Sequence, residues 1–209
     1  MKTNKLLASD RDQRKARAAT LWTPLVKLTD PHPLVQTSYP ILESAASDDT
    51  GRLRATEAEC LDIRVSPVNL ARALLIMDAL VKSLNAIDCD VLVSEGRTKV
   101  RLGDISIAVA LSEEVVRKHL RAKDHDLEGY YAFGYGLYEK KPSPTGALCL
   151  SIEDTTTYPD PSYRTNWRDV GSRRLEACLA SFVSGLLKAA AVQRVIRRRD
   201  QEKGQGSPE

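Results

Sequence analysis

One short stretch of the sequence has the residue types of a metal-dependent nuclease. Glu139 and Lys141 form an E-x-K triplet, and Asp104 or Asp126 could supply the earlier carboxylate. In such enzymes the carboxylates hold Mg²⁺ and the lysine positions a water molecule. The triplet runs directly into Pro142, which places it in a loop, and Asp104 follows a glycine in a typical hairpin turn. A tripeptide is a weak motif, so nuclease chemistry stays an alternative and no catalytic residue is assigned.

Histidine and cysteine spacing does not favour a metal site. His119 and His125 could chelate a metal with Asp124 or Asp126, but the i,i+4 ligand spacing is missing, so a solvated helix end explains them better. The cysteines are far apart and form no C-x-x-C pair. They are Cys60, Cys89, Cys149 and Cys178. We therefore predict no metal and no cofactor, and interpret the cysteines as small buried residues in a cytoplasmic protein.

Positive charge is concentrated at both ends of the chain. Residues 1–20 contain six basic and two acidic residues, and residues 188–209 contain six basic and three acidic ones. The formal net charge is only +3, so the body between the ends is net negative. This distribution fits an anionic partner such as nucleic acid, although charged solubilising tails have the same composition. The candidate contacts are Arg11, Arg14, Lys15, Arg17, Arg194, Arg197 and Arg198.

The C-terminal arginines have the better geometry. Arg194, Arg197 and Arg198 are at i, i+3 and i+4, so on a helix they share one face and could follow a phosphate backbone. The other interpretation needs no partner, because cations at a helix C-terminus complement the helix dipole by about 0.3–1 kcal/mol.

An aromatic run is the last chemical feature. Residues 130–138 hold five of the eleven aromatic residues. They could stack on unpaired bases. Their strict alternation with small residues favours instead a strand that packs its aromatic face on a helix.

Hydrophobic spacing predicts the elements that position these residues. Alternation predicts strands near 61–65, 91–93, 98–102, 105–111, 130–138 and 148–152, with a tight turn at Gly103-Asp104. Apolar residues three and four apart predict two main helices, about 67–87 with Ser66 as N-cap and about 170–199. A short helix is expected over 112–122, with Ser112 as its N-cap. The order predicts an α+β fold with a single, mostly antiparallel sheet and the two main helices packed on it.

The domain organisation follows from composition. We expect a basic flexible arm over 1–20, one α+β domain over 21–199 and a polar tail over 200–209. Apolar residues make up 42% and charged residues 28%, as in globular proteins. The longest apolar runs have five residues, at 73–77 and 107–111, whereas a membrane span needs about 20. No membrane association is expected.

Several phrases of the sequence resemble a known group of proteins. They are DPHPLV at 30–35, LDIRVSP at 61–67, RALLIMDAL at 72–80, PTGALCLSI at 144–152, and WRD at 167–169 with Leu175-Glu176. Over about residues 25–192 the chain is similar to the C-terminal region of a family of largely uncharacterised bacterial proteins associated with mobile elements. Members usually carry an N-terminal helix-turn-helix-like segment, and the region before residue 20 is too short to hold it. None of these phrases is diagnostic of a particular chemistry.

Together these features predict an accessory or regulatory module that associates with nucleic acid through its basic termini. The alternatives are a metal-dependent nuclease and a protein–protein adaptor for a separate DNA-binding subunit. A non-catalytic role is favoured, and the expected partner is nucleic acid or another protein. The sequence does not set the oligomeric state.

The helix stripes give a stability prediction. The residues expected in the core are Leu70, Leu74, Met77, Val81, Leu175, Leu179, Phe182 and Leu186. Leu74→Ala should lower the free energy of unfolding by about 2–5 kcal/mol, because it removes buried apolar surface and leaves a cavity. Chemical denaturation measures the change, and an unchanged midpoint would mean that the helix or its burial is misassigned.

Overall fold

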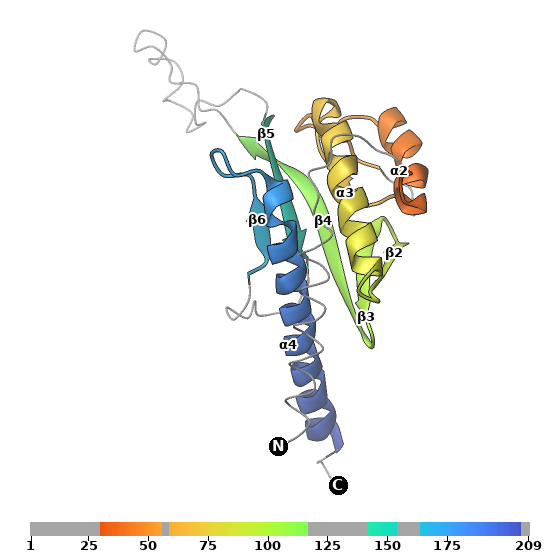
Figure 1. The fold of residues 1–209 in the computed structure, drawn as a ribbon, viewed down its shortest axis with the longest axis vertical. Coiled ribbons are helices and arrows are strands. Elements are labelled where there is room, and N and C mark those ends of the chain that lie inside the picture. Colours follow the sequence, from red (N-terminus) through yellow and green to blue (C-terminus); the bar gives the residue numbers. More distant parts are fainter. Residues whose placement is uncertain (1–29, 56–58, 117–141, 154–163, 206–209) are drawn as a thin grey trace, which may run out of the picture.

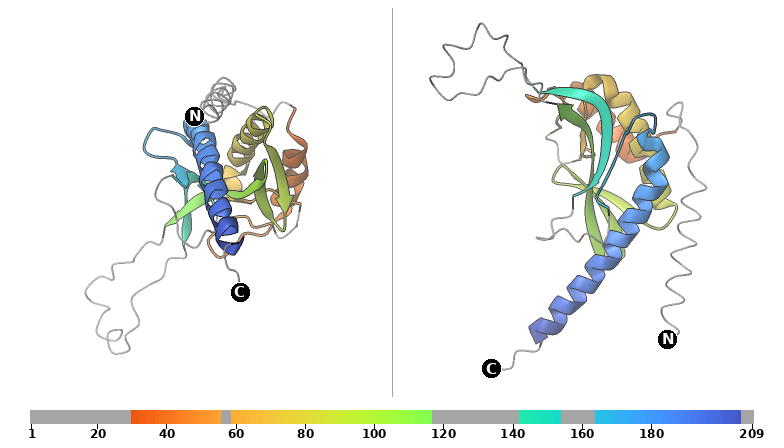
Figure 2. Two further views of the ribbon diagram at one scale, coloured as in Figure 1. Left: turned by 90° about the horizontal axis from the view of Figure 1, so that it is seen from below. Right: turned by 90° about the vertical axis from the view of Figure 1, so that its left-hand side faces the viewer.

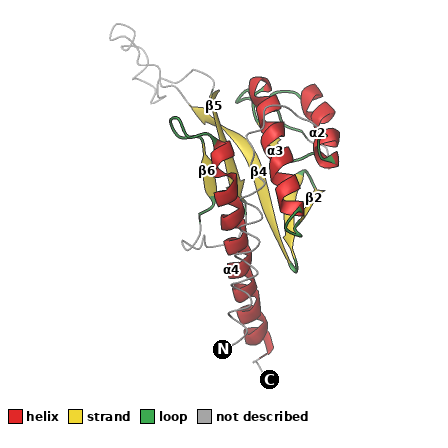
Figure 3. Cartoon of the chain, viewed as in Figure 1, coloured by secondary structure: helices red, strands yellow, loops and turns green. Residues whose placement is uncertain are grey.

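The fold is described from a computed structural model over residues 30–55, 59–116, 142–153 and 164–205 (Figure 1). In these ranges three α-helices, two short 3-10 helices and six strands alternate along the chain (Figure 3). In chain order they are α2 (Pro33–Ser44), β1 (Ile63–Arg64), η1 (Pro67–Asn69), α3 (Leu70–Asn85), β2 (Asp90–Ser94), β3 (Arg97–Leu102), β4 (Ile105–Val116), β5 (Ser143–Ile152), β6 (Asn166–Arg168), η3 (Leu175–Cys178) and α4 (Leu179–Gln205).

Strands β2 to β6 form an antiparallel sheet in which each strand lies beside its neighbour in the sequence. Strand β1 is the exception, since it pairs parallel to β4, with Ile63 aligned with Leu111. It occupies the edge of β4 beyond the end of β3. The backbone N–H of Asp62 donates to the Thr98 hydroxyl, which joins β1 to the start of β3. The long strand β4 is therefore the centre of the sheet.

All three helices lie on one face of the sheet (Figure 2). Helices α3 and α4 pack directly on the strands, and α2 packs on α3. The predicted α+β fold, with a mostly antiparallel sheet and two main helices on it, is confirmed. The opposite face of the sheet carries no helix among the described residues.

Alternation along the strands separates a buried face from a polar one. Along β4, the inward side chains of Ile105, Ile107, Val109 and Leu111 are almost fully buried, and they form one continuous apolar cluster with the helices. The residues predicted to lie in the core are all buried. They are Leu70, Leu74, Met77, Val81, Leu175, Leu179, Phe182 and Leu186. The 3.6-residue periodicity thus identified the packed faces of both helices.

The short helix predicted over 112–122 is wrong where the structure describes it. Residues 112–116 belong to β4, and Ser112 pairs with Cys149 of β5 instead of capping a helix. The N-cap interpretation failed because the extended backbone continues: Val115 and Val116 are β-branched, and Glu113 turns its carboxylate inward to buried donors.

The two main helices differ from their predicted bounds at the ends. The first begins as η1 and continues as α3, and Ser66 makes no side-chain cap to it. The second main helix was predicted from about residue 170. Before it, residues 166–168 form the edge strand β6, with Trp167 pointing into the core. Its helical turns start at Leu175, and α4 continues to Gln205, six residues past its predicted end.

A glycine in the second turn of α4 accommodates the largest side chain of the core. The Trp167 ring lies against Gly185, and a Cβ at that position would be 2.3 Å from Trp167 Cη2. Trp167 also packs edge-on against Phe182, with ring centroids 5.0 Å apart, and its indole N–H donates to Ser181. Glycine costs a helix interior about 0.5–1 kcal/mol relative to alanine. Here it allows the helix to approach the sheet.

The stretch Leu175–Glu202 is long and apolar enough to cross a membrane by length and composition. Half of its most apolar window is buried inside the protein. A helix that packs on a protein core gives the same result, so this is weak evidence for a membrane segment.

Gly185→Ala should destabilise the protein although alanine favours helix. The added methyl group meets the Trp167 ring, and relief of the clash should cost about 1–3 kcal/mol. Thermal or chemical denaturation measures the effect. Lys188→Ala, at an exposed position one turn later, is the matched control and should change stability by less than about 0.5 kcal/mol. A stabilised Gly185→Ala protein would contradict the packing of Trp167 on α4.

Candidate nucleic-acid interface

The last turns of α4 extend beyond the sheet, past the β3–β4 hairpin (Figure 1). The turn of this hairpin is Gly103-Asp104, as the sequence predicted, and Gly103 has a φ of +68° that glycine adopts readily. Arg194 and Arg197 of α4 reach this turn, and Arg198 follows them on the helix. The three C-terminal residues predicted to bind nucleic acid thus lie next to the hairpin or just beyond it.

Arg194 binds the hairpin through two acceptors. Its Nε donates to Asp104 Oδ1 at 2.9 Å, and its Nη2 donates to the backbone carbonyl of Leu102. The side chain is 39% exposed, so one edge of the guanidinium still faces solvent. Arg194 therefore connects the helix to the sheet.

Arg197 reinforces the same contact. Its Nη1 donates to the backbone carbonyl of Asp104 at 2.9 Å and lies 3.9 Å from the Asp104 carboxylate. The hydrogen bond from Arg194, aided by the charges of Arg194 and Arg197, lowers the pKa of Asp104 below its ordinary value. We call Arg194, Arg197 and Asp104 the hairpin latch. Asp104, which the sequence offered as a metal ligand, has this role instead.

Arg198 and the adjacent Arg199 are exposed. Within the described part of the chain neither side chain has a hydrogen-bond or ion-pair partner. The structure thus separates the three predicted arginines into two groups. Arg194 and Arg197 are partly neutralised by the hairpin, whereas Arg198 retains its full charge toward solvent.

Several predicted residues lie outside the described ranges. They are the basic arm residues Arg11, Arg14, Lys15 and Arg17, the nuclease residues Asp126, Glu139 and Lys141, the histidines His119 and His125, and the aromatic run 130–138. The ranges that are described contain no group of three His, Cys, Asp or Glu side chains placed to hold a metal ion.

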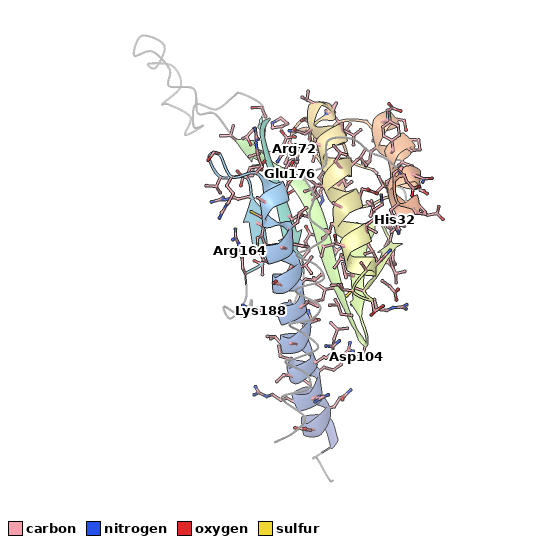
Figure 4. The ribbon with its side chains drawn as sticks, in the orientation of Figure 1. His32, Arg72, Asp104, Arg164, Glu176 and Lys188 are labelled. Carbon is pink, nitrogen blue, oxygen red and sulfur yellow. The ribbon has the colours of Figure 1, made fainter. Side chains whose placement is uncertain are left out.

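A partly buried ion-pair network at the other end of α4 was not found from the sequence. Arg72 of α3 donates two hydrogen bonds to Asp169, at 2.8 and 2.9 Å, and two to Glu176, at 2.7 and 2.8 Å (Figure 4). Asp169 also accepts the backbone N–H groups of Leu148 and Leu175. Four elements, α3, β5, η3 and the segment after β6, meet at this carboxylate.

Several phrases noted in the sequence meet at such contacts. Arg72 belongs to RALLIMDAL, and Asp169 and Glu176 belong to WRD with Leu175-Glu176. RALLIMDAL also contains the buried Asp78, which accepts the His32 backbone N–H of DPHPLV at 2.6 Å and pairs with Lys82. These residues therefore connect the elements of the fold. Their polar groups are satisfied by one another.

Glu113 is a second inward carboxylate. Its side chain is almost fully buried and accepts hydrogen bonds from the Ser66 N–H and hydroxyl and from the Gly146 N–H. Burial raises the pKa of Glu113, but these hydrogen bonds, with one from Asn69, outweigh burial and bring the pKa below its ordinary value. Ser66 is thus a hydrogen-bond donor to the sheet, where the sequence suggested a helix cap.

The Arg72 network makes stability depend on pH. Burial raises the pKa of Asp169, yet the hydrogen bonds from Arg72, Leu148 and Leu175 outweigh it, so the folded pKa is lowered. The unfolded carboxyl, with a pKa of about 3.9, binds protons first as the pH falls. The stabilisation is therefore complete above about pH 5 and is lost as the pH falls through the lowered folded pKa.

Asp169→Asn should remove much of this dependence. The amide has one acceptor where the carboxylate has two, so its NH₂ group would face donors from Arg72 and the backbone, at a cost of about 3 kcal/mol at pH 7. Urea unfolding at pH 7 and pH 3.5 tests this, and the variant should lose less stability than the wild type between the two. Asp90→Asn, an exposed strand position, is the matched control. Equal pH dependence in Asp169→Asn and wild type would contradict the assignment.

Comparison of the chain with protein-family models, with curated proteins and with solved structures gave no match. The geometry of the chain itself supplies the evidence on function.

Proposed function

We propose that the protein is an accessory or regulatory module that associates with nucleic acid through the basic end of α4. The observation that supports this most is the hairpin latch. Arg194 and Arg197 hold the helix end against the sheet, so Arg198 and Arg199 are presented at a fixed place beside the hairpin. Cations held in place lose less conformational entropy when they contact phosphates.

The charge of this region favours an anionic partner. From residue 188 to 202 there are five basic and two acidic residues, and the nearby Asp104 compensates one more charge. Guanidinium groups bind phosphate oxygens through two parallel hydrogen bonds. Contacts of this kind read the backbone and not the bases, so the binding should be insensitive to sequence.

The two alternatives have less support. The nuclease residues Glu139 and Lys141 are outside the described ranges, and no described cluster of ligands would hold the metal. Stacking on the described sheet face is also unsupported, because its outward positions carry no aromatic side chain. A protein adaptor remains a different outcome of the experiment below.

Fluorescence anisotropy with a labelled duplex and a labelled single strand tests the proposal. Arg198→Ala/Arg199→Ala should weaken binding at low salt and flatten the salt dependence by about 0.9 log units per lost phosphate contact on duplex DNA. Stability should be unchanged, since neither side chain has a partner in the described structure. The matched control is Arg173→Ala/Arg174→Ala, which removes the same charge from exposed positions before η3. It should bind as the wild type does.

Asp104→Ala tests whether the hairpin latch contributes to nucleic-acid binding. It loosens the latch and leaves every arginine in place, so affinity should fall although a competing carboxylate is removed. An unchanged affinity would mean that the latch does not position Arg198 and Arg199 for binding. If the wild type shows no anisotropy change at low salt, or if both double variants lose affinity equally, the α4 interface is wrong. Capture of a protein partner with no nucleic-acid binding would favour the adaptor.

A further inference from the structure

A polar groove lies away from α4, where β1 meets the turn between β2 and β3. Its volume is about 420 Å³. Arg64 on β1 and Arg97 on β3 point to the outward side of the sheet, since their neighbours in each strand are buried. Arg54 and the turn residue Glu95 complete the charged lining.

The central arginine of the groove is already neutralised and fixed. Arg64 donates to both oxygens of Asp62, at 2.7 and 2.8 Å, and to Glu153 at 2.8 Å across β4. Ala110 of β4, in the strand between β1 and β5, is buried. The Arg64 side chain is therefore held in place by its two carboxylate partners, and its charge is neutralised.

The arginines Arg54 and Arg97 lack the ion pairs that other arginines of the sheet have. Arg101 pairs with Asp90 at 2.6 Å and Arg168 pairs with Glu114 at 3.2 Å. Among the described residues, the side chains of Arg54 and Arg97 have no hydrogen-bond or ion-pair partner, although both residues line the groove. Glu95 and Asp62 are the carboxylates of the lining, and Asp62 is paired with Arg64, so Arg54 and Arg97 are the unpaired cations of the groove.

We propose that this groove binds a phosphate group between Arg54 and Arg97. Two guanidinium groups offer the paired N–H donors that match phosphate oxygens, and a concave wall shields the contact from water. The phosphate belongs either to a small phosphate-bearing molecule or to a nucleic-acid backbone. The site is separate from the α4 interface, because β3 places its six residues, at about 3.3 Å each, between the groove and the hairpin latch.

Titration of the ¹⁵N-labelled protein with sodium phosphate tests this, with sodium chloride at equal ionic strength as the reference. Saturable amide shifts are expected at Arg64, Gly96 and Arg97. Arg54→Gln/Arg97→Gln should raise the Kd about tenfold or more, because two charged hydrogen-bond donors are lost. Arg101→Gln, on the same face of β3 but outside the groove, should bind as the wild type does.

Shifts that do not saturate or that chloride reproduces would overturn the proposal. So would equal affinity of the wild type and Arg54→Gln/Arg97→Gln. Titration with a single-stranded oligonucleotide then shows which kind of molecule supplies the phosphate. If the ligand is a nucleic-acid backbone, the oligonucleotide shifts the same amides at lower concentration than phosphate does. If the ligand is a small molecule, only phosphate shifts them. Repeating the titration with Arg198→Ala/Arg199→Ala separates the two proposals, since loss of α4 binding leaves the phosphate response of the groove intact.

Discussion

The carboxylate of Asp169 is the contact on which the arrangement of the fold depends. One oxygen accepts from Arg72 and the Leu148 N–H, and the other from Arg72 and the Leu175 N–H. A carboxylate removed from water must have its acceptor positions satisfied, and here donors from three different elements satisfy them. Asp169 therefore fixes where β5, α3 and the first turn of η3 lie relative to one another, and with η3 it fixes the start of α4.

The position of α4 is then determined at two further points. Gly185 lets its second turn approach the Trp167 ring, and the hairpin latch holds its far end to Asp104. The latch is the most exposed of the three contacts, so burial decreases along the helix. The free arginines follow the least buried contact, where a charged partner can reach them without disturbing the core. The start of α4 thus contributes packing to the core, and its end carries the free positive charge.

Periodicity was sufficient for the fold and insufficient for the site. The stripe from Leu70 to Val81 and the turn at Gly103-Asp104 were predicted because each depends on residues close in sequence. The latch joins residues 90 positions apart, and the Arg72–Asp169 pair 97 apart, so no local pattern indicates either. The helix misassigned at Ser112 has the same cause. Ser112 looked favourable as a helix cap, but Glu113 next to it is held in the sheet by donors from distant segments.

The position of α4 in the chain has a consequence for how the protein folds during synthesis. Every strand of the sheet precedes this helix, so the apolar face of β4 and β5 is made before the helix that covers it. Until then that face is open to water and can pair with other chains, a condition that favours aggregation. Polar groups buried on it, such as Glu113, make this intermediate surface less uniformly apolar. A slow or interrupted translation of residues 175–205 would lengthen the exposure, so solubility during expression should respond to the rate at which this helix emerges.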